Sequence, residues 1–138
     1  MGLMKTGRLR TPRPQSDVDR VVYICHPYGE DPATNVASVR CLSRLMVEQG
    51  CLPLAPQLLL PQFIDESTER ELAMGFCLRL VALCDEVRVY GAMSEGMRLE
   101  IAEAGRLGLP VVDGDSGELL ADNGEPPRRA IARAVVQR

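Results

Sequence analysis

The stretch that decides the fold is Ser94-Glu95-Gly96-Met97-Arg98-Leu99-Glu100-Ile101-Ala102-Glu103-Ala104, which follows the apolar run Val87-Arg88-Val89-Tyr90. The apolar run predicts a buried strand, and the spacing of the apolar residues after it predicts a helix from Glu95 to Leu107. Ser94 stands at the N-cap position, and Gly108 follows the last helical residue. A strand that enters a helix through such a turn directs backbone N–H groups and the positive end of the helix dipole at one point.

Glu100 borders the buried side of this predicted helix. It follows Met97 by three residues and precedes Ala104 by four, so its carboxylate can reach a cleft above the sheet. Partial burial raises the pKa of a carboxyl group, whereas the nearby helix start opposes that shift. Two interpretations stay open from spacing alone: Ser94 and Glu100 belong to a ligand site, or they are a helix cap and a solvated helix residue.

The rest of the chain alternates strand and helix signals. Apolar runs predict three more strands, at Arg20–Cys25, Cys51–Leu54 and Leu109–Val112. Helix patterns follow the strands, and the last of them covers Arg128 to Val136. This βαβαβαβα order predicts an α/β fold: a three-layer, flavodoxin/Rossmann-like parallel sheet of four to five strands, with helices on both faces and the first strand central.

Local signals give the expected ends and faces of the other elements. Asp31 and Pro32 predict the start of the first helix, and Gly50 its end. The proline in Cys51–Leu54 favours an edge strand. Residues 55–63 predict an apolar loop that forms a pocket wall or an oligomer contact. Capping-box spacing at Thr68 and Glu71 predicts the next helix start, and the following residues predict its buried face: Leu72, Phe76, Leu80 and Leu83.

Length and composition indicate one globular domain, residues 19–138, after a flexible basic arm at 1–18. The net charge of −3 disfavours a nucleic-acid polymer or an anionic membrane as the main partner. There is no secretory signal, which predicts a cytoplasmic protein with reduced thiols. Of the five cysteines, four are expected to be small core residues: Cys25, Cys41, Cys77 and Cys84. One histidine and no spaced cysteine pair predict no metal site, and no cofactor is expected.

Ligands of open parallel sheets bind beyond the carboxyl ends of the strands, which brings His26–Gly29 and Ser94–Glu100 to the same rim. Tyr28 could stack on a base or simply close the rim. Arg98 could pair with a phosphate or remain an exposed helix residue. His26, with an ordinary pKa near neutrality, could act as an acid or only hydrogen-bond the backbone.

Several motifs resemble the nucleoside 2-deoxyribosyltransferase-like superfamily, specifically a branch of small uncharacterised proteins. The resemblance covers Val21 to Val112. The motifs are Tyr23-Ile24-x-x-Pro27-Tyr28, Ala55-Pro56-x-Leu58-x-x-Pro61-Gln62-Phe63, Cys84-Asp85-Glu86-x-x-Val89-x-Gly91 and Ser94-x-Gly96-Met97-x-x-x-Ile101.

This resemblance implies that Glu100 attacks C1′ of a deoxyribose, expels the base and forms a glycosyl-enzyme. It also implies that Ser94 and the loop after the first strand hold a 5′-phosphate. One position departs from the family pattern, because Cys77 stands where family members carry an aspartate that helps the base to leave. His26 is the candidate replacement for that acid. The aromatic C-terminal residues of the transferases also have no counterpart here.

Two functions therefore follow from the sequence. The first is cleavage or transfer of the N-glycosidic bond of a (deoxy)nucleoside or nucleoside 5′-monophosphate, with Glu100 and His26 catalytic. The second is a nucleotide-binding module without turnover, which Cys77 favours; a flavin carrier is disfavoured because the first loop lacks a Ser/Thr-rich phosphate cradle. The expected substrate-binding residues are Tyr23, Pro27, Tyr28, Gly29, Ser94, Gly96, Met97 and Arg98. Crowding of Leu58, Leu59, Leu60 and Phe63 in one loop predicts a homodimer or higher homo-oligomer.

Overall fold

The computed structural model describes residues 18–121. Residues 1–17 of the predicted basic arm lie outside this range, and so does the predicted helix Arg128–Val136. The strands are β1 (Arg20–Cys25), β2 (Cys51–Leu54), β3 (Glu86–Val89) and β4 (Val111–Asp113). The helices are α1 (Pro32–Glu48), α2 (Pro56–Leu59), the 3₁₀ helix η2 (Leu60–Gln62), α3 (Arg70–Val81) and α4 (Glu95–Leu107).

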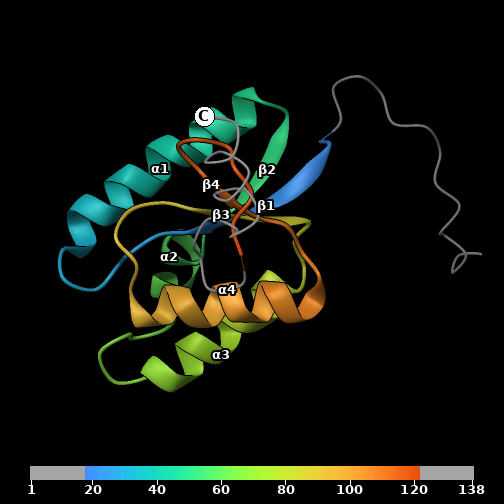
Figure 1. Ribbon diagram of the computed structural model, residues 1–138. Helices are drawn as coiled ribbons and strands as arrows, with labels where there is room; N and C mark the ends of the chain where they lie inside the picture. The colour runs from blue at the N-terminus through green and yellow to red at the C-terminus, as the bar shows by residue number, and fades with distance from the viewer. Residues whose placement is uncertain (1–17, 122–138) are drawn as a thin grey trace, which may run out of the picture.

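The four strands form one parallel sheet in the order β2-β1-β3-β4. Side chains of β1 alternate between its two faces: Val22 and Ile24 pack in the cluster with residues of α1, whereas Tyr23 and Cys25 pack with α3 and α4. Figure 1 shows the resulting layers, with α1 on one side of the sheet and α3 and α4 on the other. The predicted three-layer α/β fold is confirmed, with β1 in the interior and the proline-bearing β2 at an edge.

The turn and helix of the deciding stretch form as their local signals predict. Ser94 is extended, and its hydroxyl oxygen accepts a hydrogen bond from the Met97 N–H at 3.2 Å. Gly108 ends α4 in the left-handed conformation, with φ of 76°. Gly91, between β3 and α4, also has a positive φ of 74°, and a Cβ there would lie 2.9 Å from the Pro27 ring. Glycine at this position lets the loops after β1 and β3 come together at the rim.

Two predictions about the middle of the chain are wrong. Residues 55–63 are largely helical, because Pro56 starts α2 and Leu60 continues into η2. The capping box does not form: the N-cap of α3 is Glu69. The Glu69 side chain instead accepts from the Asp65 N–H at 2.9 Å, so the carboxylate that holds the turn before α3 is Glu69 and not the predicted Glu71.

The predicted buried face of α3 is also wrong. Leu72, Phe76 and Leu83 are exposed, and of that set only Leu80 packs partly against the core. Smaller side chains face inward instead: Ala73 and Cys77 pack with Leu60 and Ile64 in a separate apolar cluster. Small residues permit α3 to lie close to its neighbours, whereas the large apolar stripe faces outward.

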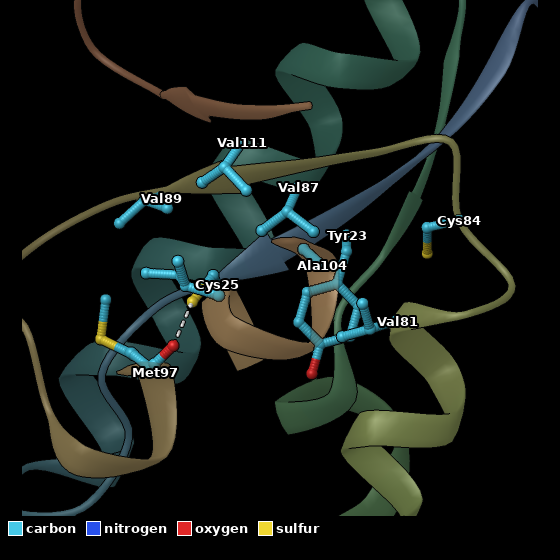
Figure 2. Close-up of a cluster of buried hydrophobic side chains, with 10 residues drawn as sticks. Tyr23, Cys25, Val81, Cys84, Val87, Val89, Met97, Ala104 and Val111 are labelled. Atoms are coloured by element: carbon cyan, nitrogen blue, oxygen red, sulfur yellow. Dashed lines mark hydrogen bonds between the residues drawn. The ribbon is translucent and has the colours of Figure 1, made fainter. Parts of the chain in front are cut away.

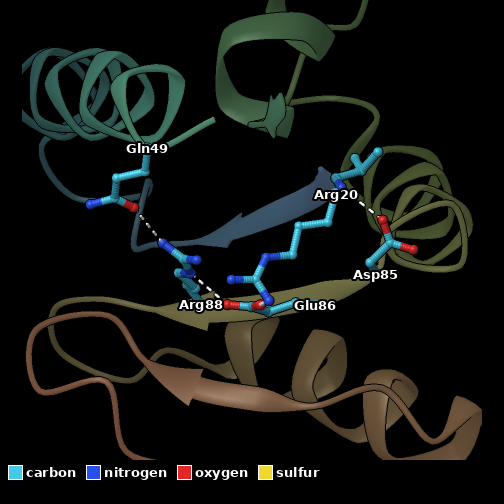
Figure 3. Close-up of polar contacts among 6 residues, drawn as sticks. Arg20, Gln49, Asp85, Glu86 and Arg88 are labelled. Atoms are coloured by element: carbon cyan, nitrogen blue, oxygen red, sulfur yellow. Dashed lines mark hydrogen bonds and ion pairs between the residues drawn. The ribbon is translucent and has the colours of Figure 1, made fainter. Parts of the chain in front are cut away.

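The amino-terminal ends of β1 and β3 carry a group of charged residues (Figure 3). Glu86 is only 5% exposed and pairs with Arg20 at 3.1 Å and with Arg88 at 2.5 Å. Asp85 accepts from the Val21 N–H at 2.8 Å, which joins the start of β3 to β1. These contacts lie at the end of the sheet opposite to the rim, so we assign them a structural role.

Candidate functional site

A pocket of about 580 Å³ lies at the carboxyl ends of β1 and β3. This volume is in the range of pockets that hold small organic ligands. The residues that line it come from the loop after β1, from α2 and η2, from α3 and from the start of α4. They include His26, Tyr28, Gly29, Pro56, Gln57, Leu60, Arg70, Cys77, Ser94, Gly96, Met97 and Glu100.

Glu100 lies in the wall of this pocket and is 8% exposed. The Tyr23 hydroxyl donates to its Oε2 at 2.6 Å, and the Cys25 thiol donates to its Oε1 at 3.2 Å. Neither donor carries a charge, and no cation pairs with Glu100 among residues 18–121. The carboxylate is therefore held in one orientation by neutral hydrogen-bond donors.

Burial raises the pKa of the Glu100 carboxyl group, and hydrogen bonds from Tyr23, Cys25 and Cys77 partly oppose that shift. The raised pKa agrees with the expectation from the position of Glu100 at the buried side of α4. Burial and the Glu100 charge likewise raise the pKa values of the Tyr23 hydroxyl and the Cys25 thiol well above their usual range. Both groups keep their protons at neutral pH and remain donors to the carboxylate.

The cysteines divide between the core and the pocket. Figure 2 shows Cys25 and Tyr23 on β1, where both side chains enter the cluster between the sheet and α4. Cys77 lines the pocket beside Tyr23 and Glu100, and burial followed by the Glu100 charge raises its pKa to about 12. Cys84 is buried as predicted, whereas Cys41 is exposed and is not a core residue. At neutral pH Cys77 is therefore a neutral thiol and carries no charge into the pocket.

Both ring nitrogens of His26 take part in hydrogen bonds. Nδ1 lies 2.8 Å from the carbonyl oxygen of Pro27, and Nε2 lies 3.2 Å from the Ser38 hydroxyl. A carbonyl oxygen only accepts, so Nδ1 carries a proton and donates it to the Pro27 carbonyl. This N–H is therefore committed to the backbone.

The first turn of α4 forms one side of the pocket. Ser94, Glu95 and Gly96 line it together with Met97. The Ser94 oxygen accepts from the Met97 N–H, which leaves its hydroxyl proton free to donate to a ligand. Residues 94–97 therefore line the pocket at the rim, and Ser94 both caps α4 and forms part of the pocket wall.

The pocket collects most, but not all, of the predicted site residues. Three of them are absent from its lining: Tyr23, Pro27 and Arg98. Tyr23 lies behind Glu100 and donates its hydroxyl to that carboxylate. Sequence reasoning missed Gln57 on α2, which donates to the carbonyls of His26 and Pro27 at 2.8 and 3.1 Å. A polar residue in an apolar segment was the only signal for it.

Charges around the pocket are mainly negative. Its lining contains four carboxylates, from Glu66, Glu71, Glu95 and Glu100, and one guanidinium, from Arg70. Arg70 lies 3.5 Å from Glu66, which reduces its availability to a ligand. This balance disfavours a phosphate group and favours a neutral ligand.

The described part of the chain contains no group of three or more His, Cys, Asp or Glu side chains that could hold a metal ion. None of the helices within residues 18–121 is both long enough and apolar enough to span a bilayer.

Comparison with solved structures shows which known architecture this fold resembles. The chain matches a 2-deoxyribosyltransferase from Leishmania mexicana with a TM-score of 0.50, over 86% of this chain and 98% of that one. The two sequences are 14% identical, so the match defines the fold. The fold implied by the sequence motifs is thus confirmed.

Residues 20–113 match the family model of DUF7768, a domain of unknown function, and the chain belongs to that family. No curated protein matches the sequence.

Proposed function

We propose that this protein cleaves or transfers the N-glycosidic bond of a neutral (deoxy)nucleoside, with Glu100 as nucleophile. The observation that carries the proposal is the environment of Glu100 in the pocket wall. Its carboxylate is buried, accepts hydrogen bonds from Tyr23 and Cys25, and forms no ion pair with a residue in the range 18–121. A poorly hydrated carboxylate fixed by neutral donors suits attack on a carbon that becomes oxocarbenium-like. The fold likeness to a 2-deoxyribosyltransferase supports the same chemistry.

In the proposed reaction, a Glu100 oxygen bonds to C1′ of the sugar as the C1′–N bond breaks. The electron pair of that bond leaves with the base, whose nitrogen takes a proton from a water molecule in the pocket. Water or a second base then attacks C1′, releases the Glu100 carboxylate and gives its own proton to solvent. Ser94 and the first turn of α4 bind sugar hydroxyls, since the surrounding carboxylates disfavour a 5′-phosphate.

The second candidate is a nucleoside-binding module of the same fold without turnover. Two observations favour it: Cys77 is a neutral thiol in place of an acid, and the His26 Nδ1–H already donates to the Pro27 carbonyl. Under this candidate Glu100 binds a sugar hydroxyl and no bond breaks.

Incubation with a panel of nucleosides and their 5′-monophosphates, followed by chromatography of free base, separates the two candidates. We expect base release from nucleosides, with turnover lowered by several orders of magnitude in Glu100→Gln, as for loss of a covalent nucleophile. Glu103→Gln is the matched control, because Glu103 lies on the same helix and pairs with Arg106 at 2.6 Å. Binding without base release establishes the second candidate. Wild-type turnover in Glu100→Gln rules out the mechanism.

A further inference from the structure

The outward face of α3 carries a stripe of large apolar side chains that the rest of the described chain leaves exposed. Leu72, Phe76 and Leu83 are 47, 39 and 68% exposed, and they follow one another at helical spacing. Figure 1 shows α3 next to α4 at the outer side of its layer. Single exposed apolar residues need no explanation, whereas a stripe of them along one helix is typical of an interaction surface.

A glycine lies in the middle of this stripe. Gly75 is exposed inside α3, and a Cβ placed on it would meet no atom of another part of the fold within 4 Å. The fold of one chain therefore does not require a glycine at this position. Glycine is less favourable than alanine inside a helix, but its lack of a side chain lets a second helix approach the backbone closely. Gly75 thus marks a point at which another helix can cross α3.

Two opposite charges flank this glycine at equal distances. Glu71 precedes Gly75 by four residues and Arg79 follows it by four, so all three residues share one face of the helix. Each charged residue lies about 6 Å from the glycine along the helix axis, at a rise of about 1.5 Å per residue. Both are exposed, and neither forms an ion pair within residues 18–121.

We propose that this face binds a second copy of the chain, with the two α3 helices crossing antiparallel about a two-fold axis at Gly75. Such an axis brings residues that lie equally far before and after the crossing point opposite one another. Glu71 of each copy then meets Arg79 of the other, which gives two identical ion pairs, and Leu72 and Phe76 are covered at the same crossing. Because the face is complementary to itself, a second copy fits it. This surface differs from residues 55–63, which the sequence predicts as an oligomer contact.

Exchange of the two charges tests this crossing. Glu71→Arg and Arg79→Glu each place like charges opposite one another at both positions, whereas the double variant restores both ion pairs in reversed order. Sedimentation equilibrium of the full chain should show a wild-type dimer at tens of micromolar, roughly where standard interfaces persist. We expect each single variant to raise the dimer dissociation constant about tenfold or more, and the double variant to return it to within about threefold of wild type.

Two further sets of variants separate this interface from general effects of charge and folding. Glu48→Arg and Arg44→Glu are the matched controls, because they make the same charge changes on α1, on the opposite side of the sheet, and both should leave the dissociation constant unchanged. Gly75→Leu puts a side chain at the crossing point, where a Cβ meets no other part of its own fold. Leucine also favours a helix, so this variant should be a monomer that circular dichroism shows to be folded.

The oligomeric state of these variants decides the proposal. A wild-type monomer at that concentration overturns it, and so does a dimer that withstands both single reversals. If both single reversals dissociate the dimer and the folded double variant does not restore it, the proposed ion pairs are wrong. If Phe63→Asp dissociates a dimer that the α3 variants leave intact, residues 55–63 form the contact and the proposal is refuted. None of these measurements involves base release, so they leave the proposed reaction standing.

Discussion

Replacing Tyr23 by Phe isolates the contact that holds Glu100. The substitution keeps a ring that is 0% exposed and deletes only the hydroxyl that donates to Oε2 at 2.6 Å. A hydrogen bond to an ionised acceptor contributes roughly 1.5–3 kcal/mol, and one between neutral groups about 0.5–1.5 kcal/mol. The destabilisation should therefore be about 1 kcal/mol larger at pH values where Glu100 is ionised than where it is protonated.

The sign of this pH dependence follows from the raised pKa of Glu100. A carboxyl group whose pKa is higher in the folded than in the unfolded state stabilises the fold below its unfolded pKa, and that stability is lost as pH rises through the folded pKa. Tyr23→Phe raises the folded pKa further, because the removed donor favours the ionised form. The cost of the mutation thus grows from acid to pH 8.

Urea unfolding followed by circular dichroism measures this cost across the pH range. In a thermal melt the same 1 kcal/mol corresponds to a change of about 3–5 °C in Tm for a domain of this size. Tyr90→Phe is the matched control, since Tyr90 is also buried but does not hydrogen-bond Glu100. If Tyr23→Phe costs the same at pH 8 as in acid, the hydroxyl does not stabilise an ionised Glu100.

Three further outcomes are expected. Glu100→Gln should raise the free energy of unfolding at neutral pH by about 1 kcal/mol, measured by urea unfolding, because it removes a buried charge that opposes folding; lower stability contradicts this. Ser94→Ala should cost about 1 kcal/mol in the same assay, because the Met97 N–H loses its cap, and an unchanged midpoint argues against the cap. Phe63 is 61% exposed, so if the predicted homo-oligomer forms through residues 55–63, Phe63→Asp should shift light scattering toward monomer. A wild-type monomer at tens of micromolar, roughly where standard interfaces persist, excludes that assembly.

Local signals determined which elements the sequence could reveal. The bounds of α4 depend on a serine cap and a left-handed glycine, both of which act within a few residues and were predicted correctly. The strands follow from apolar runs, with β3 and β4 displaced by only one or two residues from the predicted ranges. The position of Glu100 at the buried side of α4 followed from helical spacing.

Other features depend on contacts between distant elements and were not predictable in the same way. The orientation of α3 was wrong because its large apolar residues suggest one face, whereas close packing with η2 and its neighbours selects the face with Ala73 and Cys77. Cys25 looked like a small core residue, but its thiol reaches Glu100, 75 positions away. The side chain of Gln57 is held by two backbone carbonyls that lie 31 and 30 positions earlier in the chain.

The covalent intermediate is the central claim and can be observed directly. A 2′-fluoro substituent on a 2′-deoxynucleoside slows both formation and breakdown of the glycosyl-enzyme, because both steps have an oxocarbenium-like transition state. The glycosyl-enzyme should then accumulate. Intact-mass measurement after acid quench should show one fluorodeoxyribosyl group per chain, and peptide mapping should locate it on Glu100. The assignment would be contradicted if the enzyme released free base from the fluorinated analogue without forming an adduct. An adduct on a residue other than Glu100 would also contradict it.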